Sequence, residues 1–331
     1  MAQADTKSRA NPSKDMSVNF SASYVFQLFI NGIVNGSGYA MLAVGFGLIL
    51  HVTGRFHIAY AAIYATTAFI AAQVGASWHF DFVGSMVAGV LAGVIIAVGL
   101  EAIVYAPLAK RAGSSKLFIV FIAALGLNIA GQSILGLIWP NAISMTNIHL
   151  TEARIGSAYT TNLAVSSTIV AWVVLLAVWV IIRWTKLGRM IRAVRVNPEL
   201  STDIGVDPRR IFLVVFAIAT AIGGINVVFI AAMAAPASNL GQTTILYAVT
   251  AAFVAGPSAS VLTIAAIGLL IGLIESLSGI FVTQGWQSVV VFSILLIYVI
   301  VRAGTTVNWS AVLRRKVATP QSASSQLGAE S

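Results

Sequence analysis

Long apolar stretches separated by short polar segments fill the sequence between residues 24 and 302. A helix needs about 20 apolar residues to cross the hydrocarbon of a bilayer. The stretch 243–256 is short for a full crossing, and a tilted, broken or re-entrant helix is tolerated only where protein or a water-filled cavity surrounds it. The pattern predicts an all-α, polytopic integral membrane bundle of about eight or nine transmembrane helices. The predicted spans are 24–50, 57–78, 82–105, 117–139, 163–183, 211–235, 243–256, 260–282 and 286–302.

Polar segments flank this apolar region. Residues 1–22 are rich in Ser, Asn and Lys and lack the apolar core of a cleavable signal peptide, which predicts a disordered N-terminal tail. Residues 304–331 are predicted to form a cytoplasmic C-terminal tail. Between the tails, the sequence predicts one transmembrane domain, 23–303, which contains a polar segment at 185–208.

Basic residues gather in a few of the polar segments. Most of the 19 Lys and Arg residues lie in or beside 107–116, 184–210 and the C-terminal segment, which share one side of the membrane if every predicted span crosses. Cytoplasmic loops of membrane proteins carry an excess of Lys and Arg. The 184–210 segment is therefore predicted to be cytoplasmic. The N-terminus then lies outside if all the spans cross and inside if one does not.

The composition supports a membrane protein and excludes other classes. Hydrophobic residues make up 58% of the 331 residues and charged residues 9%, whereas a soluble domain carries about 25% charged residues. There is no cysteine for a disulfide or a thiolate metal site, and the four histidines show no metal-ligand spacing. No converging set of acid, base and metal ligands indicates an enzyme. Topology accounts for the net charge of +9, so no nucleic-acid partner is predicted.

Glycines with a spacing of four residues recur within the predicted spans. Small residues at this spacing let two membrane helices approach closely. Together they favour a packed bundle of several helices over a single membrane anchor. The pairs are Gly32/Gly36, Gly89/Gly93 and Gly268/Gly272.

The stretch NPELSTDIGVDP, 197–208, is unusually rich in polar residues, proline and glycine for so apolar a chain. Asn197 is suited to cap a helix and Pro198 to occupy its first position. Glu199 adds favourable negative charge to the first turn, and Gly205 fits a left-handed exit. Asp207 and the proline after it repeat the cap at the start of the next span. A short cytoplasmic helix of about two turns is predicted, and because it is too short to be stable alone it must pack against something. It is either a solvated connector or a docking element.

The chain resembles the LivH-type permease subunits of branched-chain amino acid ABC transporters. The most specific match is TKLGRMIRAVRVNPELSTDIGVD, 185–207, which is similar to that family's cytoplasmic loop. NGIVNGSGYAMLAVGFGLIL, 31–50, matches the first span, and EAIVYAPL, 101–108, followed by IAALGL, 122–127, adds a third match. The resemblance runs from about residue 27 to residue 302. It implies a multi-pass permease of a bacterial inner membrane that is not itself an enzyme.

The resemblance also implies the partners. No Gly-x4-Gly-Lys-Ser/Thr nucleotide-binding loop occurs in the sequence, so no cofactor is expected in this chain, and ATP with magnesium belongs to separate ATP-binding subunits. A second homologous permease subunit and an extracytoplasmic solute-binding protein are further implied partners, beside membrane lipid. The solute is an amino acid, branched-chain or other, or a related small polar molecule.

A rigid element is needed to pass the motion of the ATP-binding subunits to the spans, since a flexible loop would absorb it. The short helix of the 185–208 segment is the predicted coupling element. Its basic residues have a competing role as topology determinants that face lipid headgroups. The candidate coupling residues are Gly188, Arg189, Arg192, Asn197, Pro198, Glu199, Asp203 and Gly205.

Polar side chains within spans are candidates for the translocation path, because they are costly in hydrocarbon and usually face the bundle interior. Asn31, Asn35 and Tyr39 share one helical face through their spacing of four, with Ser37 nearby. Hydrogen bonding between helices is the alternative role for such residues. The further candidates are Asn128 and Gln132, which are also spaced by four, the isolated Asn226, and Glu275.

Two carboxyl groups lie in or near spans. Glu101 is placed to pair with Lys110 or Arg111. Glu275 is deeper, and it is able to relay protons, bind the ammonium group of a solute, or accept hydrogen bonds. A proton relay would suit an ion-coupled secondary transporter, and such a transporter or a channel for a small solute is the alternative function. Dependence on a separate ATPase distinguishes it from an ABC importer.

Overall fold

The computed structural model describes residues 22–111, 116–141, 143–145, 148 and 151–306. The N-terminal tail predicted at 1–22 lies outside these residues except for Ala22, and 307–331 of the predicted C-terminal tail lies outside them as well. The described part is overwhelmingly helical, as the apolar pattern predicts.

A helix occupies each of the predicted spans. Six helices in the described part of the chain are long and apolar enough to cross a membrane. The helix α10, at the stretch predicted to be short, has 16 residues. The helices at the predicted spans are α1 (Ala22–Thr53), α2 (Tyr60–Ser77), α3 (Phe82–Leu100), α5 (Lys116–Ile138), α6 (Asn162–Trp184), α9 (Pro208–Met233), α10 (Leu240–Ala255), α11 (Val261–Ser278) and α12 (Gln287–Thr306).

Short elements extend or join these helices. The helix α3 continues through a π-helical segment, Glu101–Tyr105, into α4 (Ala106–Arg111). Between α6 and α9 lie α7 (Lys186–Val196) and α8 (Pro198–Asp203), and a 3-10 turn, Gln284–Trp286, precedes α12.

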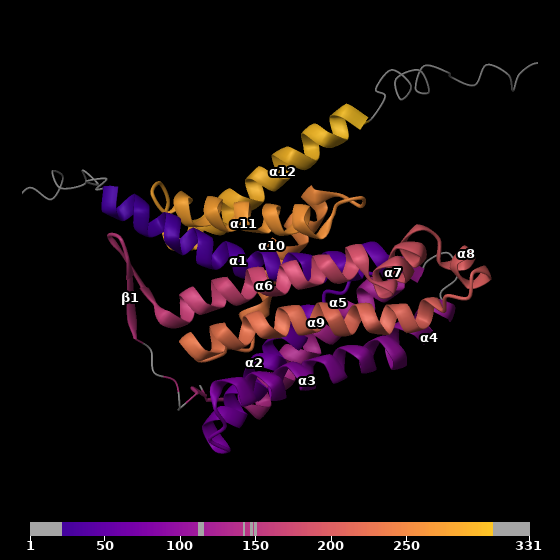
Figure 1. Cartoon of the computed structure of the whole chain (residues 1–331), viewed down its shortest axis with the longest axis horizontal. Coiled ribbons are helices and arrows are strands. Elements are labelled where there is room, and N and C mark those ends of the chain that lie inside the picture. The colour runs from indigo at the N-terminus through magenta and orange to yellow at the C-terminus, as the bar shows by residue number, and fades with distance from the viewer. Residues whose placement is uncertain (1–21, 112–115, 142, 146–147, 149–150, 307–331) are drawn as a thin grey trace, which may run out of the picture.

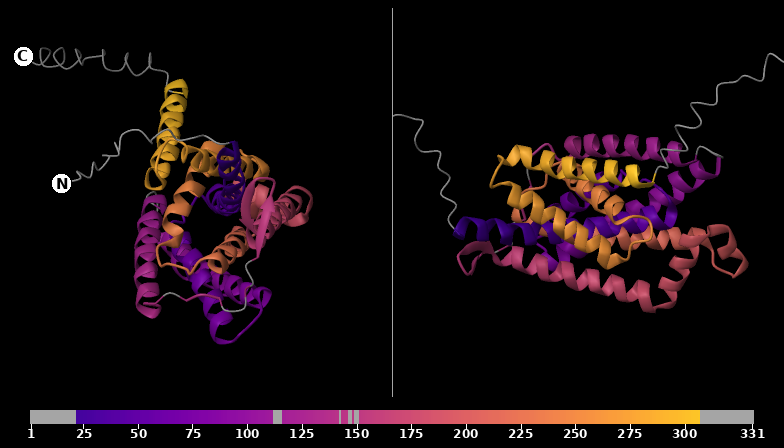
Figure 2. Two further views of the ribbon diagram at one scale, coloured as in Figure 1. Left: turned by 90° about the vertical axis from the view of Figure 1, so that its left-hand side faces the viewer. Right: turned by 90° about the horizontal axis from the view of Figure 1, so that it is seen from above.

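The long helices run side by side along one axis of the molecule (Figure 1). The helices α7 and α8 lie at one end, here named the basic end. A two-stranded hairpin and the start of α1 lie at the other, here named the hairpin end (Figure 1). The helix α12 projects from the side of the bundle, as the left view shows (Figure 2). The two ends present different chemistry.

The apolar pattern does not predict the hairpin. Its strands, β1 (Glu152–Ile155) and β2 (Ala158–Thr161), pair antiparallel, and Gly156 takes a positive φ of 60° in the turn between them. The amide side chain of Gln27 donates to the carbonyl of Tyr159 over 2.9 Å and accepts from its N–H over 2.7 Å. The first turns of α1 are thereby fixed to the hairpin.

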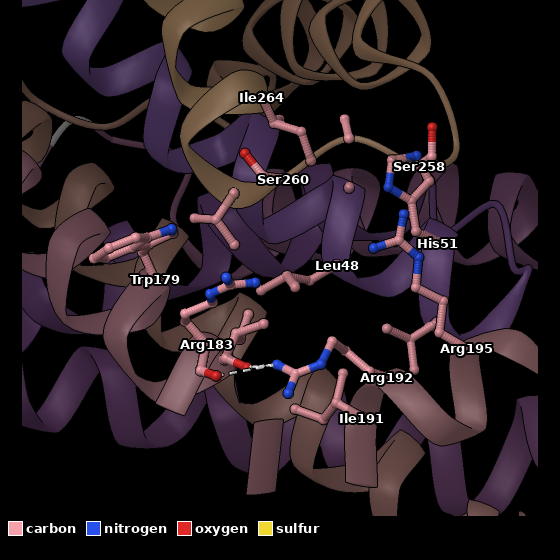
Figure 3. Close-up of a pocket in the computed structure, with 15 residues that line it drawn as sticks. Leu48, His51, Trp179, Arg183, Ile191, Arg192, Arg195, Ser258, Ser260 and Ile264 are labelled. Carbon is pink, nitrogen blue, oxygen red and sulfur yellow. Dashed lines mark hydrogen bonds between the residues drawn. The ribbon is translucent and has the colours of Figure 1, made fainter. Parts of the chain in front are cut away.

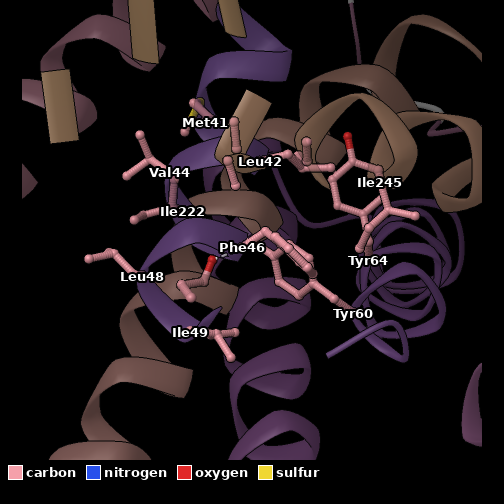
Figure 4. Close-up of a cluster of buried hydrophobic side chains, with 14 of the residues drawn as sticks. Met41, Leu42, Val44, Phe46, Leu48, Ile49, Tyr60, Tyr64, Ile222 and Ile245 are labelled. Carbon is pink, nitrogen blue, oxygen red and sulfur yellow. Dashed lines mark hydrogen bonds between the residues drawn. The ribbon is translucent and has the colours of Figure 1, made fainter. Parts of the chain in front are cut away.

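The hydrophobic core surrounds the second half of α1, where Met41, Val44 and Phe46 are buried (Figure 4). Two buried tyrosines of α2 reach into this core and satisfy their hydroxyl groups there, because an unpaired polar group in an apolar interior is costly. Tyr60 donates to the carbonyl of Ala219 over 2.6 Å. Glycine at position 45 leaves room for this tyrosine, since a Cβ there would meet the Tyr60 hydroxyl.

The three glycine pairs lie at close helix contacts, as predicted. A Cβ on Gly272 of α11 would collide with the backbone of Gly36 on α1, and a Cβ on Gly268 would collide with the backbone of Ala40. The helix α3 approaches α2 in the same way, because a Cβ on Gly89 would meet Ala71 at 2.8 Å. The contacts of Gly268 and Gly272 hold α1 and α11 together along their length.

Candidate functional site

The short helix predicted at the basic end is present as α8, with the predicted ends. The Asn197 side chain accepts hydrogen bonds from the N–H groups of Glu199 and Leu200, over 2.9 and 3.1 Å. Pro198 occupies the first turn, and Gly205 leaves the helix with a φ of 81°. The cap at Asn197 and the positive φ at Gly205 therefore set where α8 begins and ends.

The segment before α8 is also helical, which the sequence analysis does not predict. The helix α7 buries Gly188, Ile191 and Val194, and this spacing of three was the available signal. Glycine is required at position 188, because a Cβ there would collide with the carbonyl of Ile182 on α6. Thr185 caps α7 by accepting from the N–H of Gly188 over 3.2 Å. The helix α7 therefore packs on the bundle and carries α8 outward.

Three exposed apolar side chains follow one another along α7 and α8. Val196 is 85% exposed, Leu200 62% and Ile204 70%. Leu200 and Ile204 are four residues apart, in α8 and at its C-cap, whereas Val196 ends α7 on the other side of the extended residue Asn197. Glu199 and Asp203 are exposed beside them, whereas Ser201 is buried against the bundle. We name Val196, Leu200 and Ile204 the apolar row. The sequence analysis missed it, although the spacing was visible.

The two candidate arginines of α7 differ in their surroundings. Arg189 is exposed. Arg192 is exposed as well, but its guanidinium donates to the carbonyl of Ile182, so it turns back toward α6.

At the hairpin end, a cavity of about 640 Å³ brings together four of the eight polar candidates for the translocation path. We name it the vestibule. Asn31, Asn35 and Tyr39 line it from α1, and Glu275 lines it from α11. Ser276 fixes the two helices to each other there, since its hydroxyl donates to the carbonyl of Leu28 over 2.6 Å. The shared face predicted for the three α1 residues is confirmed.

Glu275 is the charged group of this vestibule. Its Oε1 accepts from the Tyr247 hydroxyl over 2.8 Å, and that hydroxyl lies 2.7 Å from the Ser288 hydroxyl. Among the described residues, no hydrogen bond reaches the Glu275 Oε2 atom. The ring of Tyr39, which lines the vestibule, packs on the ring of the buried Tyr247 with 4.8 Å between their centroids. A carboxyl group, two amides and an aromatic ring together suit a small solute that has an amino group.

The other four polar candidates do not line the vestibule, and they make hydrogen bonds between or along helices instead. The Trp172 indole donates to Ser37 over 3.1 Å, and Asn226 donates to the Tyr64 hydroxyl over 2.7 Å. Gln132 donates to Asn128 over 3.2 Å. The bonds of Ser37 and Asn226 join different helices, which is the alternative that the sequence analysis left open, whereas the Gln132–Asn128 bond lies within α5.

The pairing predicted for Glu101 is wrong. Its carboxylate forms an ion pair with Arg55, in the connection between α1 and α2, and not with Lys110 or Arg111. The two basic residues lie more than two helical turns further along α4, whereas the bundle folds Arg55 against the π-helical segment. The Arg55 guanidinium also lies over the Phe212 ring, 5.3 Å from its centroid. The pair joins three segments beneath α8.

Several known proteins are similar to this chain in sequence. The LivH permease protein of the high-affinity branched-chain amino acid transport system of Salmonella typhimurium is 23% identical over 297 residues, covering 84% of this chain and 94% of that protein. The corresponding BraD protein of Pseudomonas aeruginosa is 24% identical over 294 residues, with the same coverage of 84% and 94%. Among solved structures, PsaBC from Streptococcus pneumoniae in complex with Fab matches with a TM-score of 0.47 and 13% identity, over 84% of this chain and 94% of that chain.

A family model described as the branched-chain amino acid transport system permease component matches residues 28–300. This range includes α7, α8 and every residue that lines the vestibule except Tyr24. The match covers most of the chain, so this protein belongs to the family of branched-chain amino acid ABC transporter permeases.

Proposed function

We propose that this permease subunit imports an amino acid across the inner membrane of a bacterium, with ATP-binding subunits docked on α7 and α8. The apolar row carries this proposal. Exposed apolar side chains on a capped helix outside the bundle are typical of a surface that a protein partner covers. A partner that moves this helix would move α6 and α9 with it, because α7 and α8 connect directly to both.

The basic end is then cytoplasmic, in keeping with the excess of basic residues in α7 and the segments around it. The helix α1 runs from the hairpin end to the basic end, so the start of α1 and the hairpin face the outside. The vestibule opens on the side from which a solute-binding protein would deliver its cargo. A second, related permease subunit beside this chain completes the proposed assembly.

The vestibule supports an amino acid as the solute. Its Glu275 carboxyl provides an acceptor for an ammonium group, and the side-chain amides of Asn31 and Asn35 provide donors for a carboxylate. The relatives LivH and BraD carry branched-chain amino acid transport in their names. Leucine is therefore the first solute to test.

Docking of the ATP-binding subunits is tested with the double variant Leu200→Asp/Ile204→Asp. It places two charges in the apolar row, so we expect it to lose copurification of the ATP-binding subunits and ATP-driven leucine uptake in proteoliposomes. The control is Ile155→Asp, which charges an exposed apolar position at the hairpin end and should retain the ATP-binding subunits. Retention of these subunits by the double variant, or uptake by this chain without them, would contradict the proposal.

A further inference from the structure

A second cavity, of about 260 Å³, lies at the basic end between α1, α6, α7 and the start of α11. We name it the arginine cavity. Arg183, Arg192 and Arg195 line it together with His51, and Figure 3 shows their side chains around one space. None of the residues described as lining it is acidic. The proposed import mechanism gives this cavity no role.

The positive charge of the cavity has no counter-charge within the described part of the chain. No ion pair there includes any of the three arginines. Arg192 donates to the carbonyl of Ile182 and Arg195 to the carbonyl of Pro257, but a carbonyl oxygen leaves the formal charge uncompensated. Burial lowers the pKa of Arg195, because it takes the cation away from water. An anion bound among these groups would remove this cost.

The start of α11 adds to the positive potential. Ser260 caps this helix by accepting from the N–H of Thr263 over 3.2 Å, and Ser260 and Val261 both line the cavity. The positive end of a helix of 18 residues therefore adjoins the arginines. Cations and a helix start from separate elements converge on one space, as in an anion site.

The deeper part of the cavity is apolar. Leu48, Trp179 and Ile264 line it from α1, α6 and α11, which are membrane-spanning helices. Trp184, which is exposed, lies with its ring 5.2 Å from that of Trp179, and tryptophans gather at the level of lipid headgroups. The cavity thus combines a cationic rim at the interface with an apolar floor in the membrane.

We propose that the arginine cavity binds the phosphate-bearing headgroup of an anionic phospholipid, with the first carbons of its acyl chains over the apolar floor. Basic pockets between membrane helices on the cytoplasmic side suit such headgroups. An acidic surface of the ATP-binding subunits is the less suitable occupant. Arg192 and Arg195 turn back toward α6 and the connection between α10 and α11, away from the apolar row.

Such a lipid would affect the coupling element. Its phosphate would bridge Arg183 on α6, Arg195 on α7 and the start of α11, and α7 leads directly into α8. A bound headgroup therefore holds α7 against the bundle. The consequence for transport rests on the proposed function, because it assumes that α8 receives the motion of the ATP-binding subunits. Lipid binding itself does not depend on that assumption.

The test measures binding of phosphatidylglycerol to the purified full-length chain in neutral detergent by native mass spectrometry. We expect Arg183→Gln/Arg195→Gln to weaken binding about tenfold or more, since each basic group near a headgroup contributes to it. The charge-retaining variant Arg183→Lys/Arg195→Lys should lose less. The control Lys186→Gln/Arg210→Gln removes the same charge from exposed positions that do not line the cavity, and it should stay within about twofold. Thermal unfolding checks that each variant is folded.

Four results would overturn the proposal. Equal weakening by the control variant would show a general charge effect, and equal binding of phosphatidylcholine would show that the anionic headgroup is not recognised. Displacement of the lipid by millimolar inorganic phosphate would show a site for a free anion. Displacement by purified ATP-binding subunits would assign the cavity to that protein contact. Because no ATP or solute is present in the lipid-binding assay, its failure leaves the import proposal intact.

Discussion

Arg55 and Glu101 form an ion pair inside the bundle, where their side chains are only 9% and 2% exposed. A buried pair is costly to break, because removal of one partner leaves an uncompensated charge away from water. Arg55 comes from the connection after α1 and Glu101 from the π-helical end of α3. The pair therefore fixes two segments that are separated in the sequence by two helices, α2 and α3.

Replacement of Arg55 by Met should destabilise the protein by about 3–5 kcal/mol, since it leaves the Glu101 carboxylate buried alone. The double variant Arg55→Met/Glu101→Met removes both charges and should recover much of the loss. Thermal unfolding in detergent measures both. Equal destabilisation by the single and double variants would show that the pair does not act as a unit.

A substitution at Gly205 tests whether α8 transmits the motion of the ATP-binding subunits. The φ of 81° at this residue suits glycine, and no atom lies within 4 Å of a Cβ built there, so Gly205→Val should strain only the backbone, by about 1–2 kcal/mol. We expect normal membrane insertion but a fall in leucine uptake for each ATP hydrolysed. Gly205→Asn, which tolerates this conformation better, should lose less.

A matched control for the Gly205 variant is Gly136→Val, on α5. This glycine has equal space around it and no positive φ, so a change of side chain alone should leave uptake per ATP unchanged. Normal coupling in Gly205→Val would remove the case for α8 as the transmitting helix.

A substitution at Gly272 tests how much the contact between α1 and α11 stabilises the bundle. Because a Cβ would collide with the Gly36 backbone, Gly272→Ala should force the helices apart and destabilise the bundle by about 1–3 kcal/mol. Gly126→Ala is the control, since a Cβ there has no atom within 4 Å. Thermal unfolding in detergent compares the two. An unchanged midpoint for Gly272→Ala would mean that the two helices separate easily.

A substitution at Glu275 tests whether the vestibule binds the solute. Glu275→Gln keeps the shape of the side chain and removes its charge, so we expect the KM for leucine uptake to rise about tenfold through loss of a charged hydrogen bond to the ammonium group. The uptake that remains should be independent of the proton gradient. Steady-state uptake in proteoliposomes, with and without a protonophore, measures both effects.

Ser278→Ala is the control for the Glu275 variant. Ser278 is buried on the same helix, donates to the Glu275 backbone carbonyl over 2.6 Å, and does not line the vestibule. It should leave KM unchanged. Selective loss of gradient-dependent uptake in Glu275→Gln would instead support an ion-coupled transporter.

The sequence by itself determined the features that depend on neighbours along the chain. The apolar stretches predicted the membrane helices, because a span is defined by its own length and polarity. The cap at Asn197 and the exit at Gly205 were predicted for the same reason, since both are set within one or two turns. The shared face of Asn31, Asn35 and Tyr39 followed from helical spacing.

Only the tertiary structure decided which distant groups meet. Glu101 pairs with Arg55 and not with Lys110 or Arg111, Tyr247 of α10 donates to Glu275 of α11, and arginines from α6 and α7 line one cavity. Spacing along a helix gives the face of a residue but not the helix that this face meets. That choice depends on how the whole bundle packs, so it lies beyond any local pattern in the sequence.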